Sequence, residues 1–181
     1  LGSNAAANIT VAGTYTVTGT DNNGCSDTAQ IVVTASSDLP TITISNNTGV
    51  TELTCTTTII NVTAVGAATY SWSNGLGNNS SVDIAAPGTY TVTGTSANGC
   101  TATSSITITQ NSTSPTVEIT NNSGSTELSC TTTSIGVTAT GASTYVWSNG
   151  LGNNAVAAIT SAGTYTVTGT AANGCTNTAN I

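Results

Sequence analysis

Five cysteines and seven acidic residues are the only side chains in this sequence with evident chemistry, because its 181 residues include no Lys, Arg or His. Without His or Lys, the usual general bases are missing, and Ser–His–Asp or Cys–His sites cannot be assembled. A pair of carboxylates could still serve a glycosidase. Glu52 and Asp83 are such a pair, but 75 residues further on Ala158 stands where Asp83 would recur. We therefore expect no catalytic residues, no enzymatic activity and no cofactor.

The same residues give little support for a metal site. Zinc sites commonly use C-x-x-C pairs or His, and the sequence has neither. Calcium sites need several oxygen ligands, and no D-x-D-x-D-G run is present. A weak calcium site that uses Asp21 or Asp27 with backbone carbonyls stays open, but we expect no dedicated metal site.

The net charge of −7, without a single basic residue, excludes several partners. Binding to nucleic acid through its phosphates needs Lys or Arg, and an anionic membrane surface would repel this chain. No apolar stretch approaches the roughly 20 residues that span a bilayer. We expect neither a nucleic-acid partner nor membrane insertion.

The sequence repeats itself with a period of 75 residues. Tyr15, Tyr90 and Tyr165 follow this interval, and so do Cys25, Cys100 and Cys175, Cys55 and Cys130, and Trp72 and Trp147. Residues 115–181 align with residues 40–106 without a gap, and most positions are identical. A fixed period without insertions indicates tandem copies of one structural unit.

The phase of this period predicts three parts: the C-terminal half of a repeat at 1–39, a complete repeat at 40–114, and a repeat lacking its last few residues at 115–181. A half repeat cannot bury its own core. We therefore expect a window on a longer polypeptide; the alternative is a protomer that a neighbouring chain completes, as in donor-strand polymers.

Period-two patterns predict about seven short strands in each repeat. Apolar and threonine residues alternate at 89–95 and 104–109, with Asn98-Gly99 between them suited to a hairpin turn. Further strands are expected at 41–45, 52–56, 60–65, 69–73 and 81–85. The predicted fold is all-β: two sheets packed face to face in a β-sandwich.

Ordered motifs give the chain a resemblance to a known family. Thr51-Glu52-Leu53-Thr54-Cys55, Tyr70-Ser71-Trp72-Ser73, Pro87-Gly88-Thr89-Tyr90-Thr91-Val92-Thr93 and Asn98-Gly99-Cys100 follow one another. This set is similar to the immunoglobulin-like and PKD-like tandem repeats of Bacteroidota surface adhesins, including those of flavobacterial gliding motility. The resemblance implies an immunoglobulin-like sandwich, export by the type IX system and a role in gliding or attachment.

The cysteine positions predict one disulfide in each repeat. Cys55 would pair with Cys100 and Cys130 with Cys175, whereas Cys25 is unpaired here because its partner would lie upstream of Leu1. The second cysteine follows Tyr90 by ten residues instead of two, so the bridge would reach the last hairpin instead of joining the sheet centres. Disulfides imply an oxidising compartment, so we expect an extracellular protein at the cell surface.

The remaining candidates are aromatic residues and one threonine. Trp72 and Trp147 could stack on sugars, but their alternating strand positions favour the core, as for Tyr90 and Tyr165. Asp27-Thr28-Ala29 resembles the short motif that Bacteroidota O-glycosylate, which makes Thr28 a candidate modification site.

Together these observations predict a structural repeat region, a stalk or filament of a secreted bacterial adhesin that projects a binding tip. Its expected partners are neighbouring repeats of the same chain or fibre, with surface glycans at a distant tip. Two alternatives are a carbohydrate-binding repeat module and a short subunit of a self-assembling extracellular fibre.

Overall fold

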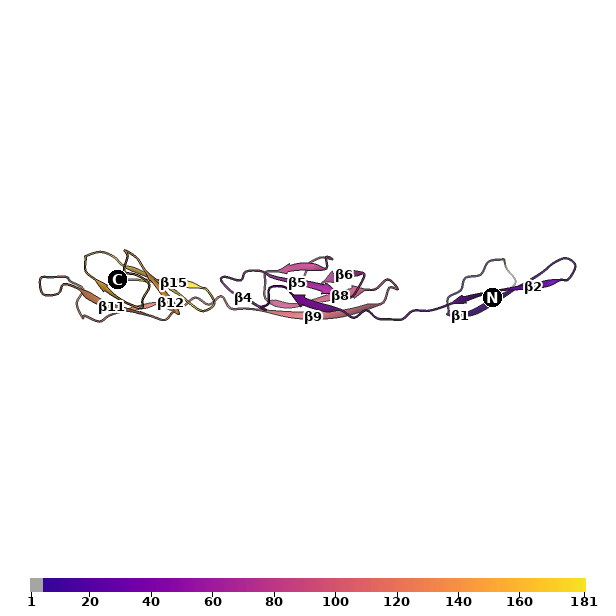
Figure 1. The fold of residues 1–181 in the computed structure, drawn as a ribbon, viewed down its shortest axis with the longest axis horizontal. Coiled ribbons are helices and arrows are strands. Elements are labelled where there is room, and N and C mark those ends of the chain that lie inside the picture. Colours follow the sequence, from indigo (N-terminus) through magenta and orange to yellow (C-terminus); the bar gives the residue numbers. More distant parts are fainter. Residues whose placement is uncertain (1–4) are drawn as a thin grey trace.

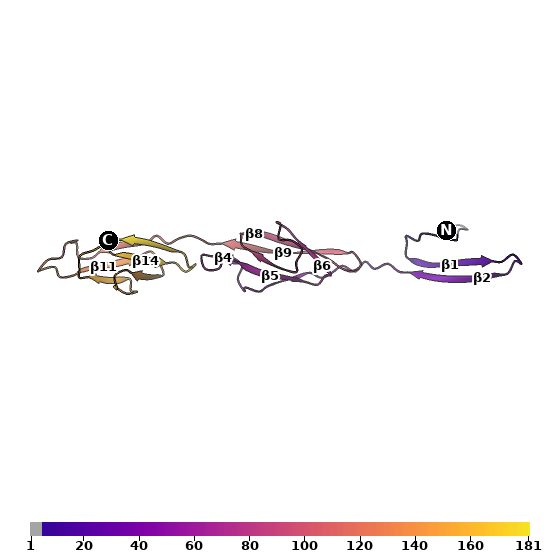
Figure 2. The same cartoon turned by 90° about the horizontal axis from the view of Figure 1, so that it is seen from above.

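Strands follow one another along a single long axis in the computed structural model, which describes residues 5–181 (Figures 1 and 2). They form three groups: an N-terminal segment with strands between residues 13 and 33, a middle segment with strands between 43 and 110, and a C-terminal segment with strands between 118 and 180. Among the described residues there is no helix able to cross a membrane. The fold is all-β, and the groups lie end to end.

Two sheets form the middle segment. In the first, β5 (Ile60–Val65) lies between β3 (Thr43–Asn46) and β7 (Ser81–Ile84). The second has the order β4 (Glu52–Leu53), β9 (Thr101–Gln110), β8 (Gly88–Thr95) and β6 (Thr69–Trp72). β4 runs parallel to β9 and all other neighbours are antiparallel. This arrangement is an immunoglobulin-like β-sandwich.

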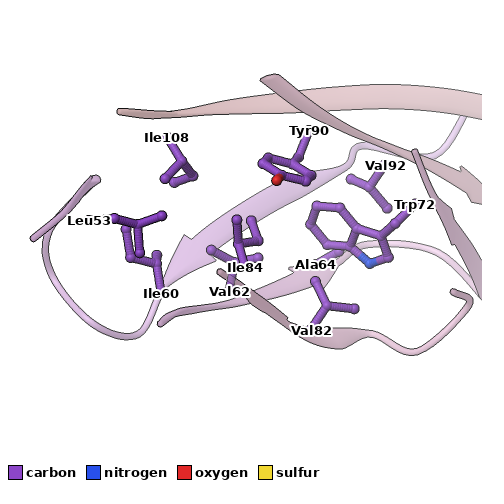
Figure 3. Packing of buried hydrophobic residues seen from close by; sticks show 10 residues of the cluster. All are labelled: Leu53, Ile60, Val62, Ala64, Trp72, Val82, Ile84, Tyr90, Val92 and Ile108. Atoms are coloured by element: carbon purple, nitrogen blue, oxygen red, sulfur yellow. The ribbon is translucent and has the colours of Figure 1, made fainter. Parts of the chain in front are cut away.

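Alternating side chains from both sheets build the core of the middle segment (Figure 3). Ile60, Val62 and Ala64 point inward from β5, whereas Tyr90 and Val92 point inward from β8. Each fully buried Val or Ile contributes about 1.5–3 kcal/mol relative to an exposed one. The intervening positions are mostly Thr and Ser, which favour strands and face water.

The C-terminal segment has a separate core inside the same kind of sandwich. One sheet has the order β10 (Glu118–Asn121), β11 (Ile135–Thr140) and β13 (Val156–Ile159). The other has the order β12 (Thr144–Trp147), β14 (Thr166–Thr170) and β15 (Thr176–Asn180). Val137 and Val167 are fully buried between them.

The four aromatic residues expected in the core are buried and hydrogen-bonded. Trp72 and Trp147 are 5% and 4% exposed, and their indole nitrogens donate to backbone carbonyls at 3.0 and 2.9 Å. The hydroxyls of Tyr90 and Tyr165 each donate to a carbonyl four residues upstream, at 2.9 Å. A tyrosine bonded in this way near the start of a strand is the tyrosine corner of immunoglobulin-like sandwiches.

The described strands of the N-terminal segment form a hairpin, in which β1 (Gly13–Thr20) pairs with β2 (Ser26–Val33). It corresponds to β8 and β9 of the middle segment, but no second sheet covers it within residues 5–39. Val17 is accordingly 63% exposed, whereas its counterpart Val92 is fully buried. The same sequence pattern thus gives the same hairpin with or without the facing sheet.

Candidate functional site

The boundary between the middle and C-terminal segments carries the most specific chemistry in the chain. On the middle segment, β4 ends at Leu53 and a tight loop follows, in which the Thr54 amide donates to the Thr57 carbonyl at 2.8 Å. The Thr54 hydroxyl accepts the amides of Thr56 and Thr57 at 3.3 and 3.0 Å. These bonds stop the strand and place Cys55 at the tip of the loop.

On the C-terminal segment, the hairpin turn between β14 and β15 presents the second cysteine. The Ala171 amide donates to the Cys175 carbonyl, and the Gly174 amide donates to the Ala171 carbonyl, both at 2.9 Å. The side-chain oxygen of Asn173 accepts the Cys175 amide at 3.1 Å. Gly174 has a φ of +77°, a conformation that glycine adopts at little cost.

A disulfide joins these two structures across the boundary. Cys55 is bonded to Cys175, with 5.0 Å between their Cα atoms and a sequence separation of 120. Cys175 is only 1% exposed, whereas Cys55 is exposed, so the contact covers the cysteine of the turn and leaves that of the loop facing solvent. We call this region, residues 54–57, 110–115 and 171–177, the junction.

The predicted pairing within each repeat is therefore wrong: Cys55 is not joined to Cys100, nor Cys130 to Cys175. Cys100 lies just before the first residue of β9, whereas β4, which precedes Cys55, pairs with the last residues of β9. Ten strand residues at about 3.3 Å each separate the two ends of β9 by about 33 Å. A disulfide requires Cα atoms within about 7 Å, so the two cysteines cannot meet in one sandwich.

Hydrogen bonds to the linker, the chain between the end of β9 at Gln110 and the start of β10 at Glu118, reinforce the junction. The side-chain amide of Asn173 donates to the Asn111 side-chain oxygen at 2.9 Å and to the Thr113 carbonyl at 3.0 Å. The side-chain amide of Asn177 donates to the Pro115 carbonyl at 3.0 Å. The turn thus holds the chain segment that enters its own sandwich, and this fixes the direction in which the C-terminal segment leaves the middle one.

The boundary between the N-terminal and middle segments has the same pattern of hydrogen bonds between turn and linker. The Cys100 amide donates to the Asn98 side-chain oxygen at 3.0 Å, as Cys175 does to Asn173. The Asn98 side-chain amide donates to the Ser36 hydroxyl at 3.0 Å and to the Asp38 carbonyl at 3.1 Å. The same turn therefore holds the same part of the linker at both boundaries.

The other three cysteines are free thiols in the described part of the chain. Cys25 and Cys130 are exposed and Cys100 is partly exposed. Cys25 and Cys100 occupy the turn position of Cys175, whereas Cys130 occupies the loop position of Cys55. The Asn-Gly-Cys recurrence was visible in the sequence, but the roles of Asn173, Thr54 and Thr56 at the junction were not.

The acidic residues do not form a site. Asp21 accepts the amides of Asn23 and Cys25 at 2.8 and 2.9 Å, and Asp27 accepts the amide of Thr28 at 2.8 Å. Asp83 accepts the side-chain amide of Asn61 at 2.7 Å on β7, in the opposite sheet from Glu52. Within residues 5–181, no three His, Cys, Asp or Glu side chains gather closely enough to hold a metal ion.

Thr28, the candidate for O-glycosylation, lies on β2 of the N-terminal hairpin. The strand is exposed along nearly its whole length, and Thr28 is itself exposed. The hydroxyl is therefore accessible to a modifying enzyme, which is the geometric requirement for a sugar at this position.

An apolar pocket of about 200 Å³ opens in the C-terminal segment, lined by Leu128, Ile135, Ile159 and Ile181 among others. In the middle segment, Ile108 fills the corresponding space, beside Leu53 and Ile60 (Figure 3). Leu128 and Ile135 are the counterparts of Leu53 and Ile60, so the pocket lies within the core of the C-terminal sandwich.

No protein-family model and no curated protein matches this chain.

Proposed function

We propose that this chain is a structural repeat region, a stalk or filament of a secreted bacterial cell-surface adhesin. Its role is to project a binding tip for attachment or gliding. The observation that supports this proposal most directly is the junction: two sandwiches placed end to end and joined by the Cys55–Cys175 disulfide. A covalent bond at the contact between neighbouring units is suited to a rod that carries tension.

The disulfide changes the route that a pulling force takes through the chain. Force applied at the two ends passes from Cys55 directly to Cys175, because the bond closes a loop with a sequence separation of 120 residues. The strands of both sandwiches between these cysteines are then shielded from complete extension. A tether built in this way resists lengthening even when individual sandwiches lose their fold.

The composition supports an exposed location for such a rod. Disulfides persist in oxidising compartments, so we place the protein outside the cell. A chain without Lys or Arg offers no cleavage site to trypsin-like proteases. Neighbouring repeats are its proposed partners, with surface glycans bound only at a distant tip. Export by the type IX system follows from the family resemblance.

Single-molecule pulling tests the mechanical role. The chain is held by handles at its two ends and stretched to full extension, first oxidised and then after reduction. Residues extend by at most about 3.3–3.6 Å each, so reduction should release about 400 Å of additional length. The matched control is the C55S/C175S variant, which should show the long extension under both conditions.

Equal lengths before and after reduction would contradict the shielded force path.

Two further measurements address the biological role. Antibodies against the chain should label intact producing cells, and intracellular labelling alone would oppose the surface location. The isolated chain should bind nothing on a glycan array; binding would favour the carbohydrate-binding alternative instead.

A further inference from the structure

We propose that the Cys130 loop is a preformed docking site for a second copy of this chain, whose Cys25 turn binds there and forms an intermolecular disulfide. This assembly rests on the proposed filament role and extends it from one chain to a head-to-tail series of chains. The occupant of the site is the N-terminal hairpin of another copy, because the bonded junction displays both halves of that contact.

The Cys130 loop already has the conformation of the bonded Cys55 loop. The Ser129 amide donates to the Thr132 carbonyl at 2.9 Å, and the Ser129 hydroxyl accepts the amides of Thr131 and Thr132 at 3.3 and 3.1 Å. The corresponding bonds around Thr54 are 2.8, 3.3 and 3.0 Å. The loop therefore needs no rearrangement to present its thiol, which is exposed.

The backbone of the Cys25 turn matches the other half of the junction, whereas its cysteine amide donates to Asp21 and that of Cys175 donates to Asn173. The Asp21 amide donates to the Cys25 carbonyl at 2.9 Å, as Ala171 does to Cys175. Gly24 has a φ of +80°, close to the +77° of Gly174. The Cys25 thiol is exposed at the tip of the hairpin, whereas Cys100, in the same kind of turn, is only partly exposed and lies beside the linker of residues 36–38. Because its thiol is more accessible, Cys25 is favoured over Cys100 as the partner of Cys130.

Bond formation needs an oxidant, which a low-molecular-weight disulfide such as oxidised glutathione supplies. The Cys130 thiolate attacks one glutathione sulfur, forms a mixed disulfide and releases one reduced glutathione. The Cys25 thiolate of the second copy then attacks the Cys130 sulfur and releases the second glutathione. Two protein thiols lose two protons and two electrons, and one glutathione disulfide gains them.

In the test, the folded chain of residues 1–181 is incubated with a glutathione redox buffer, and the products are separated on a non-reducing gel. We expect a ladder of dimers and higher oligomers that collapses to monomer on reduction. Cleavage after Asp and Glu places Cys25 on a peptide of residues 22–27 and Cys100 on a peptide of residues 84–118. After a further cut following Trp147, mass spectrometry of the dimer should show residues 22–27 linked to residues 128–147, which carry Cys130 without Cys175.

Three variants make the result specific. C130S and C25S should each lose the ladder, because each removes one half of the contact. C100S is the matched control, since it removes a cysteine from the same kind of turn and should leave the ladder unchanged. All three retain the Cys55–Cys175 bond, and a melting curve equal to that of the parent chain shows that each still folds.

Pairing between like cysteines, Cys25 with Cys25 or Cys130 with Cys130, would overturn the proposal. So would a predominant Cys100 link, or a chain that stays monomeric under oxidation. Oxidation in concentrated urea provides the reference for random pairing, in which all these links should appear. A monomeric chain would leave the stalk role intact, because the pulling experiment on the Cys55–Cys175 bond is independent of this assembly.

Discussion

Cys55 and Cys175 stand 120 residues apart in the sequence, yet their Cα atoms are 5.0 Å apart and their sulfurs are bonded. The bond connects two sandwiches, each with its own core. It therefore restricts how neighbouring units move relative to each other, in addition to stabilising either unit.

The C55S/C175S variant should melt at a lower temperature than the parent chain. Closing a loop of this length is worth about 5 kcal/mol in the chain-entropy treatment of disulfides. The loop includes most of both sandwiches, so calorimetry should show both units destabilised. The C25S/C100S/C130S variant, which removes only free thiols, should melt like the parent chain; an equal loss in both variants would contradict this prediction.

The G174A variant should disfavour the disulfide, because a Cβ at this position would overlap the side chain of Thr56 across the junction. It also forces alanine into a φ of +77°. G99A is the matched control: its φ is +84°, but nothing lies within 4 Å of the added Cβ. Titration with reduced and oxidised glutathione should show that G174A loses the Cys55–Cys175 bond under less reducing conditions than G99A.

If G174A and G99A gave the same titration, an alanine in the Cys175 turn would weaken the Cys55–Cys175 bond no more than one in the distant Cys100 turn. The contact between the turn and the Thr56 loop would then contribute nothing to the junction.

The N173A variant should loosen the linker without unfolding either sandwich. It removes the side-chain hydrogen bonds to Asn111 and Thr113, each worth about 1 kcal/mol. Hydrogen exchange of the amides in residues 111–114 should become faster, whereas exchange in β11 and β14 should not change. Unchanged exchange in the linker would show that the disulfide and the Asn177–Pro115 hydrogen bond fix the junction without the side chain of Asn173.

The Y90F variant should destabilise the middle sandwich by about 1 kcal/mol, since it removes the hydrogen bond from the buried hydroxyl to the Ala86 carbonyl. Y15F is the control, because Tyr15 donates an equivalent bond to Val11 at 2.8 Å on a hairpin that lacks a covering sheet. Thermal melting should show a lower midpoint for Y90F only. A comparable shift in Y15F would mean that the bond stabilises the hairpin itself.

Much of the fold could be predicted from sequence because local patterns determine it. The strand expected at 60–65 is observed as Ile60–Val65, since Ile60, Val62 and Ala64 alternate with polar residues and face one core. The strand expected at 52–56 ends already at Leu53. There the Thr54 hydroxyl accepts backbone amides and turns the chain, a local competition that a period-two pattern does not reveal.

The disulfide pairing could not be predicted because a strict period fits several pairings equally well. Cys55 with Cys100 and Cys55 with Cys175 both give a rule that repeats every 75 residues. Only the parallel pairing of β4 with β9 places Cys55 and Cys100 at opposite ends of one sandwich. That pairing joins strands far apart in sequence, so no local sequence motif indicates it.

Non-reducing peptide mapping of the purified chain tests the central claim most directly. Cleavage at Asp and Glu places Cys55 on residues 53–83, Cys100 on residues 84–118, and Cys175 together with Cys130 on residues 128–181. A second cut after Trp147 separates the last two cysteines. We predict that residues 53–83 are linked to the fragment that carries Cys175. A link between residues 53–83 and 84–118 would contradict the account, because Cys55 would then be bonded within its own sandwich.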